Sequence, residues 1–375
     1  MSDTPLSEQA QSHIPPCTAP HVSDETLTSL ASACVHCGMC LSSCPTYLAT
    51  GNEGQSPRGR IRQVEALIAN RLTLEEVQPN LESCLQCLGC QTACPSGVQY
   101  GSLIDVVLKR LHAQRPKSRH RLAQALVFTM THPVWLWWAG LAGWVYRRLQ
   151  LGILLRAVGV IQRLPKALQV MEGQLPQQVP PPWATLTKGQ TFLPTPQPPH
   201  KQPSEQPPLP VWLLTGCAMH QFQPHVHRAT LKVLTAVGAT VTLPTVACCG
   251  ALAWHVQDVR LAQAQGQALL QAWQEAGKPA VLLNSAGCGA HLKHLASVFE
   301  PVVEDVFEST VEGVTQDSMW HALATEFSHH CHDVHEWLLP YAARLAERFN
   351  QNHTEHPVQH ITYQPACHLH HAQKI

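Results

Sequence analysis

The sequence predicts a multidomain α+β protein. It should have a mainly α-helical amino-terminal domain, an apolar helical segment and an α/β cysteine-rich domain with a largely parallel sheet. Two cysteine-rich loops alternate with stretches of helical hydrophobic period, and beyond a proline-rich stretch apolar strand patterns alternate with helical ones. The length of 375 residues fits about two to three domains.

Composition and charge exclude several classes of protein. Hydrophobic residues make up 45% and charged residues 13% of the chain, which is typical of a globular protein. Lys plus Arg and Asp plus Glu both number 25, and this balance argues against a nucleic-acid partner, which needs a basic surface. The 15 cysteines fall below the ~8–10% of a disulfide scaffold. No secretory signal is visible, so we expect a cytoplasmic protein whose clustered thiols bind metal.

The first 112 residues are predicted to form an arm and a helical domain. Residues 1–27 are polar and form the expected flexible arm, and residues 28–112 hold two cysteine clusters between helices. One helix is predicted over 102–112, with Ser102 as its N-cap. Another, over 60–71, places four apolar side chains on one face: Ile61, Val64, Leu67 and Ile68.

Residues 113–175 form an apolar, tryptophan-rich segment. Its core over 134–146 carries no formal charge but is shorter than the ~20 residues that span a bilayer, and Arg147 and Arg148 follow it directly. We therefore predict a buried helix or a helical hairpin. Docking onto a membrane subunit or a bilayer surface is the alternative, and a spanning helix is the least favoured interpretation.

A proline-rich linker and an α/β domain are predicted next. Residues 176–210 hold 12 prolines, which indicates an extended linker. Short apolar strands alternate with helices over 211–355, which predicts a largely parallel sheet. The predicted strands cover 211–217, 239–246 and 280–287, and the predicted helices cover 225–238 and 257–276.

Residues 356–375 resemble the start of a second copy of this domain. The pattern over 360–367 is again an apolar strand that ends at a cysteine, like the strand that precedes Cys217. The first copy runs from Cys217 to Cys288, whereas only eight residues follow Cys367. We therefore expect the chain to be truncated within its second repeat.

Two cysteine motifs in the amino-terminal domain predict iron–sulfur clusters. Both fit the pattern C-x2-C-x2-C-x3-C-P, which is the bacterial ferredoxin signature of a [4Fe–4S] cube. Three thiolates at three-residue intervals let one tight loop reach three iron corners, and Gly38 and Gly89 relieve crowding in the loops. The first motif contains Cys34, Cys37, Cys40 and Cys44, and the second contains Cys84, Cys87, Cys90 and Cys94.

The fourth cysteine of each motif is expected to cross to the other cluster, as in two-cluster ferredoxins. Zinc is the alternative occupant, but structural zinc sites usually take two separated C-x2-C pairs. We therefore predict a two-cluster ferredoxin-like domain with no catalytic residue of its own. Cluster 1 would use Cys34, Cys37, Cys40 and Cys94, and cluster 2 would use Cys84, Cys87, Cys90 and Cys44.

A third group of cysteines lies in the α/β domain, at Cys217, Cys248, Cys249 and Cys288. These cysteines follow successive predicted strands, and ligands of open α/β sheets bind at that edge. A metal or redox role is therefore favoured over small buried hydrophobic residues. Cys17 and Cys331 belong to no pattern and are interpreted as bystanders.

Two further features lie near the first motifs. His36 is placed either to donate a hydrogen bond to a cluster sulfur and raise its potential, or to be a solvated loop residue. Arg58 and Arg60, in the stretch SPRGR, are either a solvated helix start or a basic clamp near the clusters or a partner subunit.

The order of motifs resembles a known family. The chain carries CVHCGMCLSSCPTY, SPRGRI, CLQCLGCQTACPSGVQY, the apolar stretch, the proline-rich linker, LLTGCAM, CCGAL, NSAGCG and ACHLHHAQ in turn. Over residues 28–375 this order resembles the iron–sulfur subunits of glycolate oxidase (glycolate dehydrogenase). Iron–sulfur subunits of lactate-utilisation enzymes, anaerobic glycerol-3-phosphate dehydrogenase and heterodisulfide reductase share parts of the layout.

The resemblance implies an electron-transfer role. Such a subunit passes electrons from a separate FAD-bearing subunit, where a 2-hydroxy acid is oxidised, toward a quinone pool or another membrane acceptor. This implies a peripheral location on the inner face of the cell membrane. In relatives the CCG-type domain, named for its Cys-Cys-Gly motif, occurs twice and in some holds a further iron–sulfur centre. Here Cys217, Cys248, Cys249 and Cys288 match the first copy, and Cys367 matches only the opening of the second, so the resemblance makes these five cysteines the candidate ligands of an additional centre.

Two other functions are considered beside this one. The chain has no GxGxxG loop, so a flavin or NAD would sit on a partner, which argues against a stand-alone dehydrogenase. A heterodisulfide-type thiol–disulfide reductase would instead use the CCG domain for catalysis. A non-catalytic iron–sulfur sensor is the third option.

Overall fold

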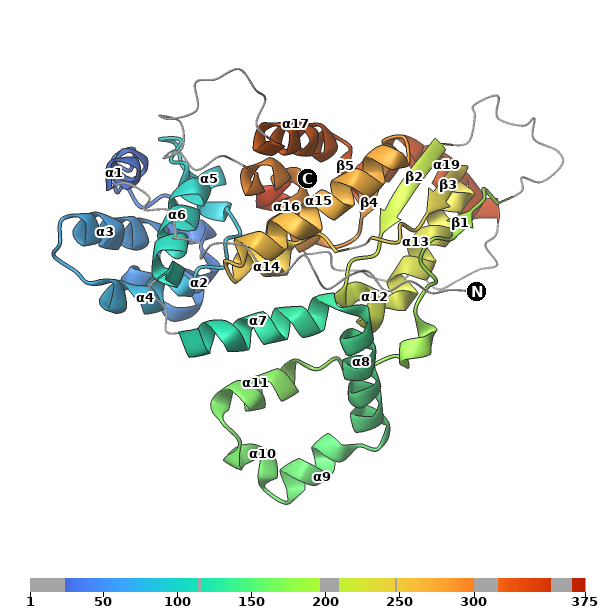
Figure 1. Ribbon diagram of the computed structural model, residues 1–375, viewed down its shortest axis with the longest axis horizontal. Helices are drawn as coiled ribbons and strands as arrows, with labels where there is room; N and C mark the ends of the chain where they lie inside the picture. Colours follow the sequence, from blue (N-terminus) through green and yellow to red (C-terminus); the bar gives the residue numbers. More distant parts are fainter. Residues whose placement is uncertain are drawn as a thin grey trace, which may run out of the picture.

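A computed structural model describes residues 24–113, 117–195, 209–246, 248–299, 316–351 and 366–374. Within these ranges the chain is mostly helical with one five-stranded mixed sheet, as the sequence predicts (Figure 1). The arm predicted over 1–27 lies almost entirely outside the described residues, and so does most of the strand predicted over 360–367.

The cysteine-rich domain is a small helical core that carries two loops. The helix predicted over 60–71 is confirmed, and Ile61, Val64 and Leu67 are buried on its inner face. Its elements are α1 (Asp24–Ser32), η2 (Leu41–Ser43), α2 (Pro45–Thr50), η3 (Glu53–Gln55), α3 (Pro57–Ile68), α4 (Leu74–Glu82), α5 (Gly89–Thr92) and α6 (Tyr100–Ala113).

The prediction of Ser102 as an N-cap is wrong. Helix α6 already begins at Tyr100, and the amide of Leu103 donates to the carbonyl of Gln99 at 3.1 Å. Burial of Val98 and Tyr100 explains the earlier start, because both side chains anchor this turn in the core. The phenol of Tyr100 lies 3.7 Å from the thiol of Cys84, so the start of the helix contacts the second cysteine loop.

The apolar segment is a series of helices that project from the rest of the chain (Figure 1). Helices α7 and α8 form a hairpin, as expected, and Pro133 at the first position of α8 marks the turn. Only Leu136 and Gly140 of α8 are buried, and no helix among the described residues is long and apolar enough to cross a bilayer. The helices are α7 (Lys117–Thr131), α8 (Pro133–Arg148), α9 (Leu151–Ala157), α10 (Val160–Arg163) and α11 (Lys166–Gln174).

The sheet has the strand order β1-β3-β2-β4-β5, and all neighbours are parallel except β1 and β3. The three predicted strands are present with shorter bounds, whereas β1 and β5 were not predicted. Both are too short to show a period of two, and β1 lies within the predicted proline-rich linker. The strands are β1 (Thr191–Phe192), β2 (Leu209–Leu214), β3 (Ala239–Thr242), β4 (Ala280–Leu283) and β5 (Cys331–Asp333).

Alternate residues of β2 bury on opposite faces of the sheet. Trp212 and Leu214 pack in one core with helices α15 and α17, and Val211 and Leu213 pack in another with α13. The other elements of this domain are η4 (Pro182–Ala184), α12 (Ala218–Phe222), α13 (Pro224–Ala236), α14 (Ala251–His255), α15 (Val259–Glu275), α16 (Ala286–Lys293), η5 (Leu295–Val298), α17 (Gln316–His329), α18 (Val334–Leu338), η7 (Leu339–Tyr341) and α19 (Ala342–Gln351).

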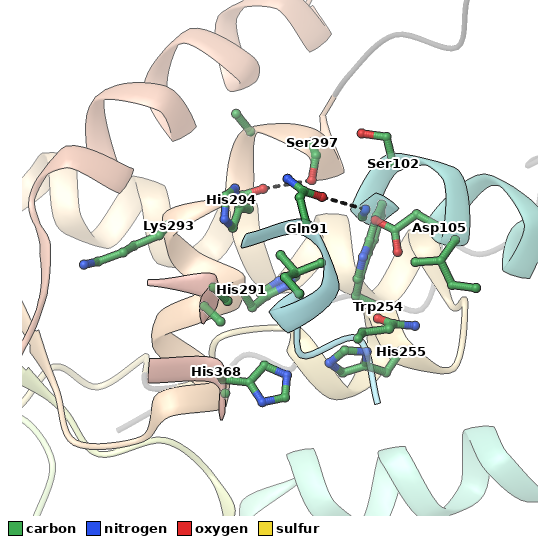
Figure 2. A pocket seen from close by; sticks show the side chains of 18 of the residues that line it. Gln91, Ser102, Asp105, Trp254, His255, His291, Lys293, His294, Ser297 and His368 are labelled. Atoms are coloured by element: carbon green, nitrogen blue, oxygen red, sulfur yellow. Dashed lines mark hydrogen bonds between the residues drawn. The ribbon is translucent and has the colours of Figure 1, made fainter. Parts of the chain in front are cut away.

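The two domains meet through α5 and α6 on one side and α14 and α16 on the other (Figure 2). A π-helical turn, η8 (His368–Ala372), contacts both α16 and α5. The side chain of Gln373 donates to the carbonyl of Ala286 at 2.9 Å and so fixes this turn against α16. The domain that carries the two cysteine motifs therefore lies directly against the α/β domain.

Two tryptophan substitutions compare a buried position of the α/β domain with an exposed position on α8. Trp273 is fully buried against Phe327, and its indole donates to the carbonyl of Pro279 at 2.8 Å. We expect Trp273→Ala to lower the free energy of unfolding by about 3–5 kcal/mol, since it leaves a cavity and an unpaired carbonyl. Trp138→Ala, at a 56% exposed position, should change it by less than about 0.5 kcal/mol. Urea unfolding measures both, and equal losses would contradict this packing.

Candidate iron–sulfur centres

Two small cavities in the cysteine-rich domain are each lined by four cysteines. The loop that forms the first cavity curls through left-handed backbone at His36 (φ 53°) and Gly38 (φ 84°). In the second loop Gln86 and Leu88 have φ values of 51° and 61°. The two cavities are similarly small, with a volume of about 20 Å³ each. Cys34, Cys37, Cys40 and Cys94 line the first cavity, and Cys44, Cys84, Cys87 and Cys90 line the second.

The electrostatics of the thiols agree with this grouping. Burial raises the pKa of Cys34, and the negative charge of Cys94 raises it further. Burial likewise raises the pKa values of Cys87 and Cys90, and Cys44 is among the thiols whose charge adds to both. Each fourth cysteine therefore lies beside thiols of the other motif.

The donor set fits iron–sulfur cubes. Four thiols surround each cavity, and thiolates are the ligands of [4Fe–4S] clusters. No three His, Cys, Asp or Glu side chains in the described part of the chain converge as a single metal ion requires. A cube gives each thiolate an iron of its own, so its ligands surround a volume rather than one point.

A buried arginine lies beside the second cavity. Arg60 is 1% exposed, and its guanidinium donates to the carbonyl of Asn80 at 2.8 Å and to the hydroxyls of Thr46 and Ser83 at 3.0 Å each. Its Nη1 atom lies 3.9 Å from Sγ of Cys44. Burial works against this charge, but the phenol of Tyr100 and the nearby thiols outweigh it and raise the pKa of Arg60. Of the two interpretations of SPRGR, the position of Arg60 favours a clamp within the chain.

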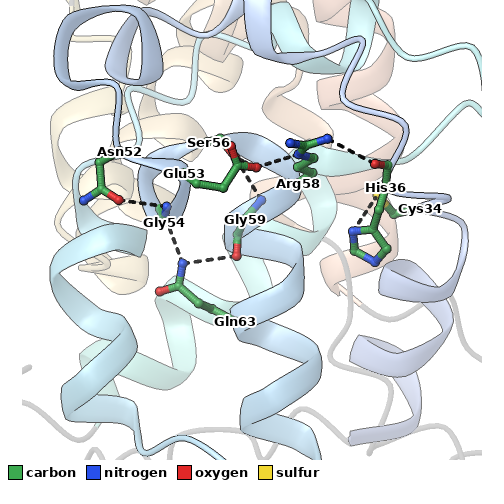
Figure 3. Close-up of polar contacts among 9 residues, drawn as sticks. All are labelled: Cys34, His36, Asn52, Glu53, Gly54, Ser56, Arg58, Gly59 and Gln63. Atoms are coloured by element: carbon green, nitrogen blue, oxygen red, sulfur yellow. Dashed lines mark hydrogen bonds and ion pairs between the residues drawn. The ribbon is translucent and has the colours of Figure 1, made fainter.

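Polar side chains also surround the first cavity (Figure 3). Arg58 lines it, pairs with Glu53 at 2.5 Å and donates to the carbonyl of His36 at 3.3 Å. The ring of His36 lies between Cys34 Sγ, 3.8 Å from Nδ1, and the Glu65 carboxylate, 3.2 Å from Nε2. A cluster thiolate and the Glu65 carboxylate both accept hydrogen bonds, so His36 donates to both only as the imidazolium.

The four cysteines of the α/β domain come together where parallel strands end. Cys217 follows β2, Cys288 follows β4, and the Cys248–Cys249 pair follows β3. The thiols of Cys249 and Cys288 lie 3.2 Å apart. A hydrogen bond from Cys248 lowers the pKa of Cys217 to about 6, and the charge of Lys188 contributes in the same direction. The same hydrogen bond, together with burial, raises the pKa of Cys248.

The remaining cysteines are Cys17, Cys331 and Cys367. Cys367 is exposed, and its charge raises the pKa of Cys87, which lines the second cavity. Cys367 therefore lies near that cavity. Its assignment to a further centre with the cysteines of the first CCG copy stays a prediction. Cys331 is buried in β5, where burial raises its pKa. Cys17 lies outside the described residues.

Sequence reasoning missed a cavity of about 460 Å³ between the two domains (Figure 2). Gln86 and Leu88 from the second cysteine loop line it together with Trp254, which follows the Cys248–Cys249 pair. Burial lowers the pKa of His291 in its wall to about 3, so this imidazole is neutral at pH 7. No pattern in the sequence predicts such a cavity, because its lining residues are far apart along the chain.

Comparisons with known proteins agree with the motif order. Residues 30–98 match the model of a 4Fe-4S dicluster domain, residues 211–293 match a cysteine-rich domain, and residues 119–175 match the linker region of the glycolate oxidase iron-sulfur subunit. No solved structure matches the chain.

Two curated relatives carry the same name. The glycolate oxidase iron-sulfur subunit of Escherichia coli (strain K12) is 31% identical over 280 residues, which are 72% of this chain and 60% of that protein. The probable glycolate oxidase iron-sulfur subunit of Bacillus subtilis (strain 168) is 30% identical over 345 residues, 90% of this chain and 70% of that protein. The chain thus spans about 60–70% of these relatives. With its dicluster, linker and cysteine-rich regions in the same order, the chain belongs to the family of glycolate oxidase iron–sulfur subunits.

Proposed function

We propose that the chain is the electron-transfer subunit of a glycolate or related 2-hydroxy-acid dehydrogenase. Electrons would come from FAD on a partner subunit and leave toward quinone or another membrane acceptor at the inner face of the cell membrane. The observation that carries the proposal is the pair of cavities, each lined by four cysteines from both motifs. The names of the two relatives support the substrate class.

The lining of the two cavities supports the proposed ligand assignment. Cys34, Cys37, Cys40 and Cys94 would hold cluster 1, and Cys44, Cys84, Cys87 and Cys90 would hold cluster 2. A [4Fe–4S] cluster supplies one-electron oxidation and reduction. Around the clusters, Arg60 holds a positive charge beside Cys44, and His36 provides a hydrogen bond toward Cys34. Both interactions stabilise negative charge on the ligands, so they favour the reduced state.

The CCG domain supports a second candidate function. Cys249 and Cys288 lie at 3.2 Å, and the lowered pKa of Cys217 favours its thiolate. Such thiols suit either a further iron–sulfur centre or a heterodisulfide-type reductase. Reduction of a disulfide substrate to two thiols by the isolated, reduced chain would favour the reductase, and additional iron above about eight per chain would favour the further centre.

The first prediction concerns the electron donor. Glycolate should reduce the iron–sulfur chromophore of the purified chain only when an FAD-bearing partner subunit is added, because the chain has no GxGxxG loop of its own. The measurement is anaerobic visible absorbance before and after glycolate. Lactate serves as the comparison substrate, and reduction by glycolate without the partner would contradict the proposal.

The second prediction concerns the crossed ligands. Cys94→Ser should remove the same cluster as Cys40→Ser, whereas Cys44→Ser should remove the other, because each fourth cysteine lies in the opposite cavity. Each variant should lose about four of about eight iron atoms per chain, as measured by iron analysis and by the spectrum of the cluster that remains. Cys331→Ser is the control and should keep all the iron. Loss of the same cluster in Cys44→Ser and Cys40→Ser would show uncrossed ligation.

The third prediction concerns the buried charge. Arg60→Gln should lower the reduction potential of cluster 2 by roughly 50–100 mV, the size expected for one charge several ångströms away at an effective dielectric constant of about 20. A redox titration followed by electron paramagnetic resonance measures the shift. The control is Arg71→Gln, at an exposed position just beyond the same helix, which should leave both potentials unchanged. Equal shifts of both clusters, or none with full iron content, would contradict the role of Arg60.

A further inference from the structure

Helices α8 to α11 expose an unusual amount of apolar surface. They project away from both domains (Figure 1). Side chains of this kind are normally buried, and large exposed apolar areas mark sites that contact a partner or a membrane. We define the α8–α10 surface by six exposed apolar residues: Val134, Trp135, Trp138, Ile153, Leu154 and Val158.

The packing of α8 explains why these side chains are free of the core. Leu136 and Gly140 form its buried stripe, and Gly140 contacts Gln221 of α12 so closely that a side chain at 140 would collide with it. The tryptophans at 135 and 138 lie off this stripe and are 55% and 56% exposed. The contact with α12 thus holds α8 in place while leaving its tryptophans outside.

The formal net charge of residues 133–174 is positive. Residues 133–174 contain five basic residues and one acidic residue, although the whole chain has 25 of each. The one acidic residue, Glu172, pairs with Arg156 at 2.5 Å. The exposed basic residues also include Arg148, Arg163 and Lys166. Tryptophan and leucine beside a cluster of arginines are typical of helices that lie in a membrane interface.

We propose that the α8–α10 surface binds an anionic lipid bilayer, with its tryptophans at the headgroup level and its arginines on lipid phosphates. This inference rests on the proposed function, since it would bring the chain to a membrane acceptor. The positive net charge favours an anionic bilayer as the occupant, because the uniform negative potential of such a surface attracts Lys and Arg side chains. Near an anionic surface each Lys or Arg contributes about 1 kcal/mol.

The test is flotation of the full chain, purified anaerobically, with vesicles. We expect it to bind vesicles of phosphatidylcholine with about 30% phosphatidylglycerol, to bind pure phosphatidylcholine at least about tenfold more weakly, and to be released by salt. Brominated lipids should quench its tryptophan fluorescence. Equal binding to neutral vesicles, or no binding to either, overturns the proposal.

Variants locate the surface. Trp135→Ser with Trp138→Ser, and Arg148→Glu with Arg163→Glu, should each weaken binding at least about tenfold. Leu339→Ser and Arg71→Glu, at exposed positions outside this region, are the matched controls and should bind normally. Circular dichroism and iron content should be unchanged in all variants. Binding that survives both double variants, or that appears only when a flavoprotein partner is added, overturns the proposal.

The proposed function can fail separately. Reduction by glycolate and the partner subunit is measured in solution without lipid, and the surface variants should retain it. If vesicles bind as expected but glycolate does not reduce the chain, the electron-transfer proposal fails and the lipid surface stands. If glycolate reduces the chain but vesicles do not bind it, the lipid proposal fails and the electron-transfer proposal stands.

Discussion

One buried cation joins the two halves of the cysteine-rich domain. The guanidinium of Arg60 contacts Thr46 and Cys44 on the side of the first motif, and Asn80 and Ser83 directly before the second. A buried charge is costly unless its donors are satisfied. Here a carbonyl, two hydroxyls and a thiol accept its hydrogen bonds, and these partners lie in both halves. The mutual position of the two cysteine loops therefore depends on this side chain, even before any ligand is bound.

Four of the eight thiols in the two cysteine motifs favour the neutral form until a metal replaces their protons. Burial raises the pKa values of Cys34, Cys40, Cys87 and Cys90. Binding of iron must therefore release protons and adds its own free energy to folding. The thiol group of the α/β domain differs, because hydrogen bonds within pairs lower the pKa values of Cys217 and Cys288 and raise those of their partners. Burial thus shifts the thiol pKa values in the cysteine-rich domain, whereas hydrogen bonds between paired thiols shift them in the α/β domain.

Residues that neighbour both kinds of thiol site line the same cavity between the two domains. Leu88 is the residue after Cys87, and Trp254 lies on the helix that follows Cys249, and both line the same cavity. The turn η8 closes this region by packing against α5 and α16. Beyond α7, the helices α8 to α11 project away from both domains (Figure 1), and they carry exposed tryptophans and arginines. The two cysteine motifs, the thiols of the α/β domain and the exposed helices α8 to α11 thus lie in separate parts of the chain.

The sequence by itself determined the features that depend on local spacing. The cysteine intervals define each loop, the period of 3.6 residues predicted the buried face of α3, and short apolar runs predicted the strands β2, β3 and β4. Ser102 shows the limit of such local signals, because burial of Val98 and Tyr100 moved the start of α6. Only the tertiary structure placed Arg60 beside Cys44, brought Cys367 close to Cys87, and formed the cavity at Trp254. These outcomes depend on which side chains fill the core, and contacts between residues distant in the chain leave no periodic pattern to read.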